Sequence, residues 1–172
     1  MLHCSFHGKL IDRHSNNLFI ACEDSDIVIY KIHVPDYIPI VDELSFFLDT
    51  QEINRAHRFY KENDKNRFII CRSLLKLILS LHLKLDIKLI NIDYHTNKKP
   101  YLSSHPSVFF NVTHSEDFGL IALANYPVGI DIEYVNTDYD VMNSMEHIFN
   151  ENEITFIKNA IHKERAFYSL WT

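Results

Sequence analysis

The chain has 172 residues, 47% hydrophobic and 13% aromatic, enough apolar material to fill one core or two small packed halves. It contains only three glycines, which excludes the glycine-rich phosphate loops of dinucleotide-binding and P-loop proteins. The formal net charge is −6 and no nucleic-acid-binding motif is present, so a nucleic-acid partner is not expected.

The beginning of the chain predicts a strand followed by helices. Residues 1–25 are weakly patterned and are expected to form an extension, and the alternating run at 26–34 predicts the first strand. Helices are then expected over 41–48, 49–60 and 64–83. Asp49 and Glu52 have the spacing of a capping box, which marks the start of the second of these helices.

The rest of the chain predicts strands and then helices. Strands are expected over 88–94, 107–113, 118–124 and 128–135, and helices over 140–149, 151–160 and 163–172. Asn150 and Glu153 repeat the capping-box spacing. The repeated order of strand, capping box and helix predicts two similar α/β halves, 26–126 and 127–172, with the second incomplete.

Two acids interrupt the apolar run PVGIDIEYV at 127–135. On a strand, Asp131 and Glu133 point to one face, while Ile130 and Ile132 point to the other. This acidic face is either a solvent-exposed edge, the commoner reason for alternation, or a site where a cation lies between two like charges.

The charges are separated along the chain. Residues 51–100 hold eleven Lys and Arg against five acids, whereas residues 101–150 hold seven acids and no Lys or Arg. A uniformly solvated surface does not produce this division. The basic segment suits an anionic ligand, and the acidic segment suits a metal ion.

The cysteines and the apolar runs predict where the protein works. The three cysteines are scattered along the chain, which suits a reducing cytoplasm better than a disulfide or zinc framework. The N-terminus lacks a secretory h-region, and no apolar run is long enough to span a bilayer. We therefore expect a soluble cytoplasmic protein with no membrane contact.

Several motifs together resemble the signature of the 4′-phosphopantetheinyl transferases. In chain order they are RFYKENDKNRF, the arginine of CRSLLK, KKPYL, FFNVTHSEDFGLIALANYPVGIDIE and FYSLWT. The series runs from about Asp26 to Thr172, and its order and spacing match the longer pseudo-dimeric type, which activates surfactin synthetase. The resemblance implies an α+β fold of two similar halves and a monomer with internal pseudo-twofold symmetry.

The resemblance also implies an activity. Such an enzyme transfers the 4′-phosphopantetheine group from coenzyme A to a serine of an apo acyl or peptidyl carrier protein. The reaction depends on positioning and on stabilising charge at phosphate oxygens, and Mg²⁺, which prefers hard oxygen ligands, suits this task. The rival interpretations are a remnant that binds coenzyme A or a carrier protein without turnover, and a relative by fold alone with no nucleotide role.

By the same resemblance, Arg55 and Lys99 are expected to bind the nucleotide phosphates, and Thr113 and His114 to contact coenzyme A. From the residues alone, Arg55 and Lys99 could equally be solvated charges, and His114 an ordinary surface or core histidine.

Two residues of the predicted helices stay ambiguous. Arg72, on a largely apolar helix, is either a buried ion-pair partner or a phosphate contact. Related enzymes often carry a basic residue at the position of Glu52. One of the expected contacts to the 3′-phosphate of coenzyme A is therefore missing here.

The acids supply the expected metal ligands. The resemblance implies that Asp131, Glu133 and Glu153 bind Mg²⁺, and that Glu153 and His114 take part in catalysis. From the sequence alone, Glu153 is better explained as a helix cap.

The resemblance leads to an expectation about the C-terminal residues. The family carries a Lys-Glu pair after W-[ST]-x, and the sequence given stops at Thr172. The interpretations are a truncated product of a longer gene, a non-catalytic remnant and an incomplete sequence. We expect residues 1–172 alone to turn over slowly or not at all.

Overall fold

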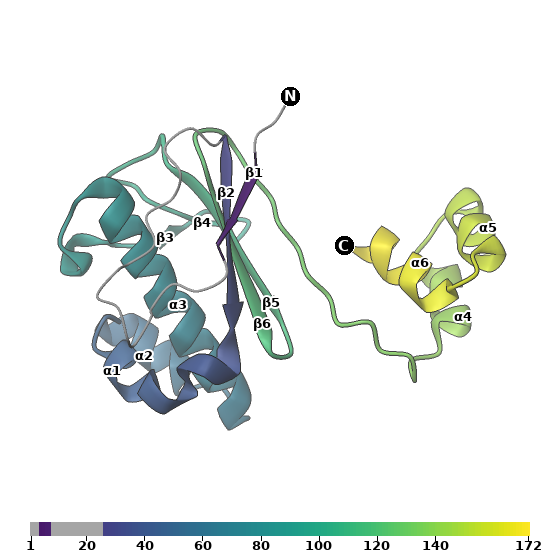
Figure 1. Cartoon of the computed structure of the whole chain (residues 1–172), viewed down its shortest axis with the longest axis horizontal. Coiled ribbons are helices and arrows are strands. Elements are labelled where there is room, and N and C mark those ends of the chain that lie inside the picture. The colour runs from purple at the N-terminus through teal and green to yellow at the C-terminus, as the bar shows by residue number, and fades with distance from the viewer. Residues whose placement is uncertain (1–3, 8–25) are drawn as a thin grey trace. The chain divides into compact units, whose positions relative to one another are not determined.

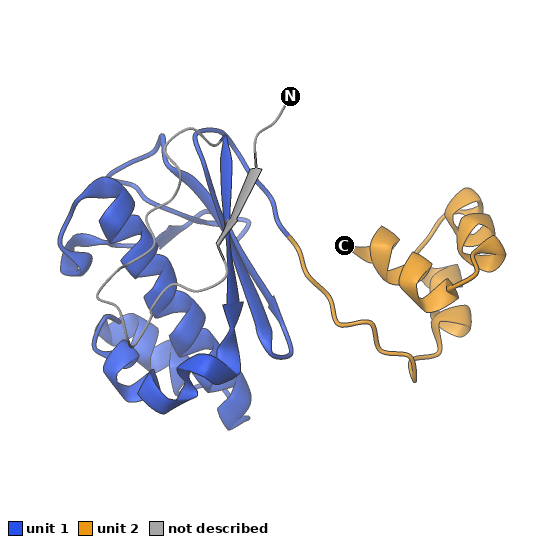
Figure 2. Ribbon diagram, viewed as in Figure 1, with its two compact units in different colours: residues 1–130 blue, residues 131–172 orange. Residues whose placement is uncertain are grey.

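The computed structural model describes residues 4–7 and 26–172. The chain divides into two compact units, Met1–Ile130 and Asp131–Thr172, coloured separately in Figure 2. Of the extension expected over 1–25, only residues 4–7 belong to the described part, where they form a strand; the remainder lies outside it. The expected domain limits at 25 and 126 stay predictions.

Unit 1 combines helices with a sheet. In chain order its elements are β1 (Cys4–His7), β2 (Ile27–His33), η1 (Val34–Ile40), α1 (Val41–Ser45), α2 (Thr50–Ala56), α3 (Glu62–Leu83), η2 (Ile87–Leu89), β3 (Asp93–Tyr94), β4 (Pro100–Tyr101), β5 (Phe109–Ser115) and β6 (Phe118–Ala124). This mixture is consistent with the predicted α+β class.

The main sheet has the strand order β1-β2-β6-β5. Strand β6 pairs antiparallel with both β2 and β5, and β1 pairs parallel with β2. The register places Ile27 opposite Ala124 and His33 opposite Phe118. Strands β3 and β4 form a separate two-stranded sheet. The long helix α3 runs alongside the main sheet (Figure 1).

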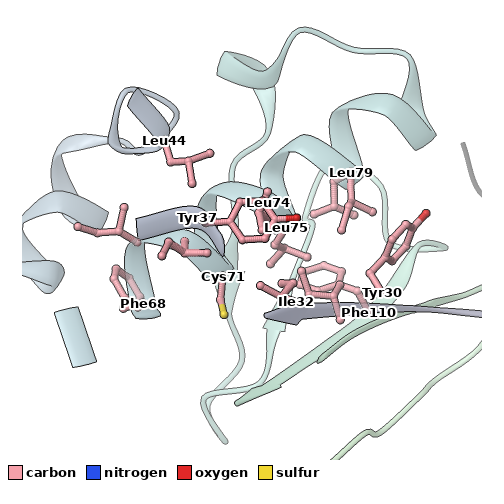
Figure 3. Packing of buried hydrophobic residues seen from close by; sticks show 14 of the residues in the cluster. Tyr30, Ile32, Tyr37, Leu44, Phe68, Cys71, Leu74, Leu75, Leu79 and Phe110 are labelled. Carbon is pink, nitrogen blue, oxygen red and sulfur yellow. The ribbon is translucent and has the colours of Figure 1, made fainter. Parts of the chain in front are cut away.

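The core of unit 1 lies between α3, α1, η1 and the sheet. Side chains from these elements meet in one cluster, and Figure 3 shows Leu74 and Leu75 of α3 in this cluster together with Ile32 of β2 and Phe110 of β5. Helix and sheet approach closely at Gly119, where an added Cβ would lie 2.7 Å from Cys71 Sγ.

Unit 2 is helical in its regular elements. These are α4 (Val141–Ser144), η3 (Met145–His147), α5 (Glu151–Asn159) and α6 (Lys163–Trp171). They pack around a small core of Val141, Met145, Ile157 and Phe167. The N-cap of α5 is the predicted capping box of Asn150 and Glu153, and α2 begins with the equivalent box of Asp49 and Glu52. Both predictions of a capping box are confirmed.

Two strand predictions were wrong. Residues 128–135 form no regular element, and none of the described strands pairs with them. A strand needs a ladder partner, and here the Asp131 side chain accepts a hydrogen bond from the Ile132 backbone, a local bond that competes with ladder formation. In place of one strand over 88–94, the structure has η2 followed by the short strand β3, because Asp86 caps η2 through the Lys88 amide.

Helix α3 is the longest helix of the described chain, and charged residues punctuate it. Within the residues described, no helix is both long and apolar enough to cross a membrane.

Candidate functional site

A pocket of about 180 Å³ opens on unit 1 between α2, α3, the β3–β4 hairpin and β5. Four basic side chains line it without any carboxylate among the described lining residues. The full lining is Arg55, Phe68, Cys71, Arg72, Leu75, Tyr94, Lys98, Pro100, Val112 and His114. The basic and aromatic groups make this pocket suited to an anion with an attached organic group.

One face of α3 builds the floor of the pocket. Phe68, Arg72 and Leu75 lie three and four residues apart, and this spacing places them on the same side of a helix. The Phe68 ring lies under two guanidinium groups, with Arg55 Cζ 5.0 Å and Arg72 Cζ 5.8 Å from its centroid. The aromatic face thereby holds both arginines at the pocket by cation–π attraction.

Tyr94 lies between the same two arginines. Arg55 Nη1 donates a hydrogen bond of 2.8 Å to the Tyr94 hydroxyl oxygen, and Arg72 Nη2 donates to the same oxygen. Both guanidinium carbons lie 5.6 Å from the centre of the Tyr94 ring. Sequence reasoning did not identify Tyr94, because a tyrosine at this position is typical of an ordinary strand.

A buried ion cluster orients the arginine side of the pocket. Lys76 Nζ donates a hydrogen bond of 3.0 Å to Glu52 Oε2. The Lys76 side chain is 4% exposed and the Glu52 side chain 12%. Arg72 Nε lies 3.6 Å from Glu52 Oε1, and Asp49 Oδ2 lies 4.0 Å from Lys76 Nζ. The two alternatives for Arg72 are therefore compatible, because the same side chain pairs with Glu52 and lines the pocket.

His114 lies at the end of β5 and lines the pocket. Desolvation is the main cause that lowers the pKa of its imidazole, and Arg67 and, least of all, Arg55 lower it further, whereas a backbone hydrogen bond and the Asp64 carboxylate raise it. The imidazole is consequently neutral near pH 7 in the ligand-free protein, and an anion beside it would favour protonation.

Lys99 and Thr113 do not line this pocket. Lys99 Nζ donates a 2.9 Å hydrogen bond to the Val128 carbonyl and so fastens the segment after β6 to the hairpin. The neighbouring Lys98 lines the pocket, and its backbone has a positive φ of 65°. Thr113 is half-buried in β5, opposite Leu120 of β6. Lys98 was missed because one of two adjacent lysines cannot be chosen without the turn geometry.

Cys71 has a packing role in the pocket wall. Burial raises the pKa of its thiol to about 12, so the thiol stays protonated at neutral pH and is a poor nucleophile.

The three acids expected to bind metal all belong to unit 2. Asp131 and Glu133 are exposed on the segment before α4, and Glu153 Oε2 accepts a 2.9 Å hydrogen bond from the Asn150 backbone as part of the cap. Within the described residues, no group of three or more His, Cys, Asp or Glu side chains could hold a metal ion. The structure therefore does not bring these acids together as a complete ligand set.

Comparison with known proteins places the pocket inside a recognised segment. The family model described as "4′-phosphopantetheinyl transferase, N-terminal" matches residues 37–125, which include Arg55, Arg72, Lys99, Thr113 and His114. Asp131, Glu133 and Glu153 lie outside the matched residues.

Curated relatives agree with this match. The 4′-phosphopantetheinyl transferase HetI of Nostoc sp. is 29% identical over 139 residues, which cover 77% of this chain and 58% of HetI. The 4′-phosphopantetheinyl transferase Sfp of Bacillus subtilis is 26% identical over 128 residues, covering 73% of this chain and 56% of Sfp. The transferase gsp of Aneurinibacillus migulanus is 33% identical over 108 residues, covering 59% and 44% respectively. The chain thus spans about half the length of these relatives.

Proposed function

The chain belongs to the 4′-phosphopantetheinyl transferase family, and on this premise we propose that it acts in the transfer of 4′-phosphopantetheine from coenzyme A to a carrier-protein serine. The observation that carries the proposal is the pocket with four basic lining residues and two aromatic rings in unit 1. Arg55, Arg72 and Lys98 supply fixed positive charge, and His114 supplies a proton-dependent one. Coenzyme A carries several phosphates on an apolar and aromatic framework, which this lining complements.

In the proposed reaction the serine hydroxyl oxygen attacks the phosphorus next to the pantetheine. A new P–O bond forms to the serine, the bond to the bridging oxygen of the pyrophosphate breaks, and 3′,5′-adenosine diphosphate leaves. The serine proton passes to a base, for which Glu153 is the candidate, because His114 is proposed to carry its proton while it holds a phosphate. The basic pocket contributes by holding the phosphates still and offsetting their charge.

We propose Mg²⁺ dependence on the strength of the acidic sequence motif, with Asp131, Glu133 and Glu153 as ligands. The described residues do not assemble these acids into a site, so no step of the transfer is assigned to the ion. Calorimetric titration of coenzyme A with and without Mg²⁺ tests the proposal. Asp131→Ala should reduce only the Mg²⁺-dependent part of the affinity, and equal affinities in both proteins with or without the ion would contradict it.

The finer features of the fold are also proposals. We propose that unit 2 belongs to a second α/β half related to unit 1, an idea supported by the matching capping boxes that begin α2 and α5. The acyl or peptidyl carrier protein as partner and a monomeric state rest on the resemblance alone, and the proposed cytoplasmic location rests on the scattered cysteines.

Two measurements test the proposed function in order. Coenzyme A should raise the melting temperature of residues 1–172, because a ligand that binds only the folded protein stabilises it. Incubation with coenzyme A, Mg²⁺ and an apo carrier protein then tests transfer through the mass increase of the carrier. Binding without transfer would fit both the slow turnover expected of residues 1–172 alone and a coenzyme A-binding remnant. No binding at millimolar ligand would exclude both the transferase and the coenzyme A-binding remnant.

A further inference from the structure

The Tyr94 hydroxyl has an unusual environment for a neutral group. It accepts hydrogen bonds from two permanently charged guanidinium groups, those of Arg55 and Arg72. A phenol oxygen has two acceptor lone pairs, and two donors occupy them both. The hydroxyl proton is then free to be donated, and two cations at the oxygen polarise the O–H bond and make it a stronger donor.

Arg72 offers a second, independent observation. Its side chain is only 10% exposed, and its Nη1 atom is buried with no hydrogen-bond partner among the described residues. Glu52 lies beside Nε, and Tyr94 accepts from Nη2, so two sides of this guanidinium are fixed. A buried N–H donor without an acceptor is costly, and an acceptor oxygen of a ligand in this pocket would satisfy it.

The two observations meet at the same pocket, which both side chains line. We propose that Tyr94 is a specificity-determining residue whose hydroxyl donates a hydrogen bond to a phosphate monoester held by Arg55 and Arg72. The inference rests on the proposed function and names the group of coenzyme A concerned, its 3′-phosphate. A monoester near neutral pH carries up to two negative charges and three terminal acceptor oxygens. It can accept from Arg55, Arg72 and Tyr94 at once, and two guanidinium groups match its charge.

The tyrosine ring has a separate role that the test must leave intact. The ring lies 5.6 Å from both guanidinium carbons and positions them whether or not a ligand is bound. Phenylalanine keeps this cation–π contact and removes only the hydroxyl. Tyr94→Phe also removes the acceptor oxygen that Arg55 and Arg72 share, so a variant with 3-fluorotyrosine at position 94, which keeps that oxygen, separates donation to the ligand from positioning of the arginines.

The experiment is calorimetric titration of residues 1–172 with coenzyme A and with dephospho-coenzyme A, which lacks the 3′-phosphate. We expect Tyr94→Phe to weaken coenzyme A binding about 10-fold and to change dephospho-coenzyme A binding by less than about 2-fold. The control is Tyr101→Phe in the same hairpin, whose ring stacks on His95 at 4.0 Å, and it should leave both affinities unchanged.

Several results would overturn the proposal. If Tyr94→Phe binds coenzyme A as tightly as the unsubstituted chain or more tightly, the hydroxyl does not contribute to binding. If the affinities for coenzyme A and dephospho-coenzyme A fall equally, the hydroxyl does not recognise the 3′-phosphate. Either result leaves the proposed function standing. If the unsubstituted chain binds neither ligand, the proposed function and this inference both fail.

A second variant keeps the test decisive if Tyr94→Phe does not fold. Replacing Tyr94 by 3-fluorotyrosine keeps the ring and the hydroxyl and makes the hydroxyl a stronger donor. Coenzyme A should then bind more tightly while dephospho-coenzyme A does not, and an unchanged preference would contradict the proposal.

Discussion

Lys76 is a lysine inside a hydrophobic core, with 4% of its side chain exposed and Glu52 3.0 Å from its ammonium group. Buried charges persist only when they are paired, because an unpaired one loses its hydration without compensation. The pair joins α2 to α3 directly beneath Arg72. At this scale the ion cluster is a support that fixes the geometry of the anion pocket.

The first prediction concerns this pair. Glu52→Gln should lower the free energy of unfolding by about 3 kcal/mol, because it leaves the buried, charged Lys76 with only the more distant carboxylate of Asp49 at 4.0 Å. The matched control is Glu62→Gln, whose partner Lys65 is more exposed, and it should cost less than about 1 kcal/mol. Urea unfolding measures both. Equal effects of the two substitutions would show that burial adds nothing to the pair.

The second prediction concerns His114. Because the pKa of its imidazole is lowered in the free protein, the neutral form dominates at pH 7, and a bound phosphate should raise this pKa. Binding then takes up a proton, so coenzyme A affinity should rise as the pH falls from about 8 to about 6.5. His114→Gln should remove this dependence. A pH dependence that persists in His114→Gln would assign the proton to another group.

Without ligand, the lowered pKa of His114 means that the folded protein loses stability, and does not gain it, as the pH falls. The folded protein disfavours the protonated imidazole, so the stability contributed by neutral His114 is present above the unfolded pKa of about 6.5 and is lost as the pH falls below it. A bound phosphate therefore favours the protonated form of His114, whereas the ligand-free fold favours the neutral form.

Sequence reasoning reached part of the pocket and missed its centre. Arg55, Arg72 and His114 could be named because charged residues in a recognisable motif carry a chemical expectation. Tyr94 could not, since its contacts join residues far apart in the chain, and Lys99 was preferred to Lys98 because adjacent lysines look alike before the turn is known.

At the scale of elements, α3 and β6 depend on a small pair of residues. Gly119 and Cys71 lie where helix and strand come closest, and a Cβ at position 119 would meet Cys71 Sγ at 2.7 Å. The close approach allows α3 to cover the sheet tightly, and Arg72, the residue after Cys71, lines the pocket from the same turn of the helix.

The third prediction follows from this contact. Gly119→Ala should destabilise unit 1 by about 1–3 kcal/mol, because the core must shift to admit the methyl group. Combining it with Cys71→Ala, which removes the sulfur, should cost less than the sum of the two single changes. Thermal unfolding of the four proteins measures the coupling. Strictly additive effects would mean that the helix moves away instead.

The elements that the sequence predicted best have local signals. The capping boxes at Asp49–Glu52 and Asn150–Glu153 need only neighbouring residues, and both are formed. The strand expected over 128–135 had the right alternation, but pairing depends on a partner strand elsewhere in the chain. Alternation of apolar and polar residues indicates which side chains share a face, but it does not show that a partner strand is available.

At the scale of the whole molecule, the chain consists of two units joined by an exposed segment. Residues 129–140 lack regular structure, and most of their side chains are exposed. The anion pocket belongs entirely to unit 1, and the expected acidic ligands belong to unit 2.

The fourth prediction tests this division. Brief chymotrypsin treatment should cut first after Tyr134, which is 61% exposed in a long irregular segment. Tyr60 is the internal comparison, since it is fully exposed but lies in a short connection between α2 and α3. Intact-mass analysis identifies the first fragment. Initial cleavage after Tyr60 would show that the joining segment is protected.

The strand order has a consequence for the time course of folding. Strand β2 pairs with β6, so the hydrogen bonds of Ile27 cannot form until Ala124, far along the chain, is in place. Loops of this length close slowly and give a high contact order, whereas β5 and β6 are neighbours in sequence and can pair early. On the ribosome, β2 leaves the exit tunnel long before its partner is made. Its unpaired edge is then open to other chains, so slow translation before residue 118 should increase aggregation of the nascent protein.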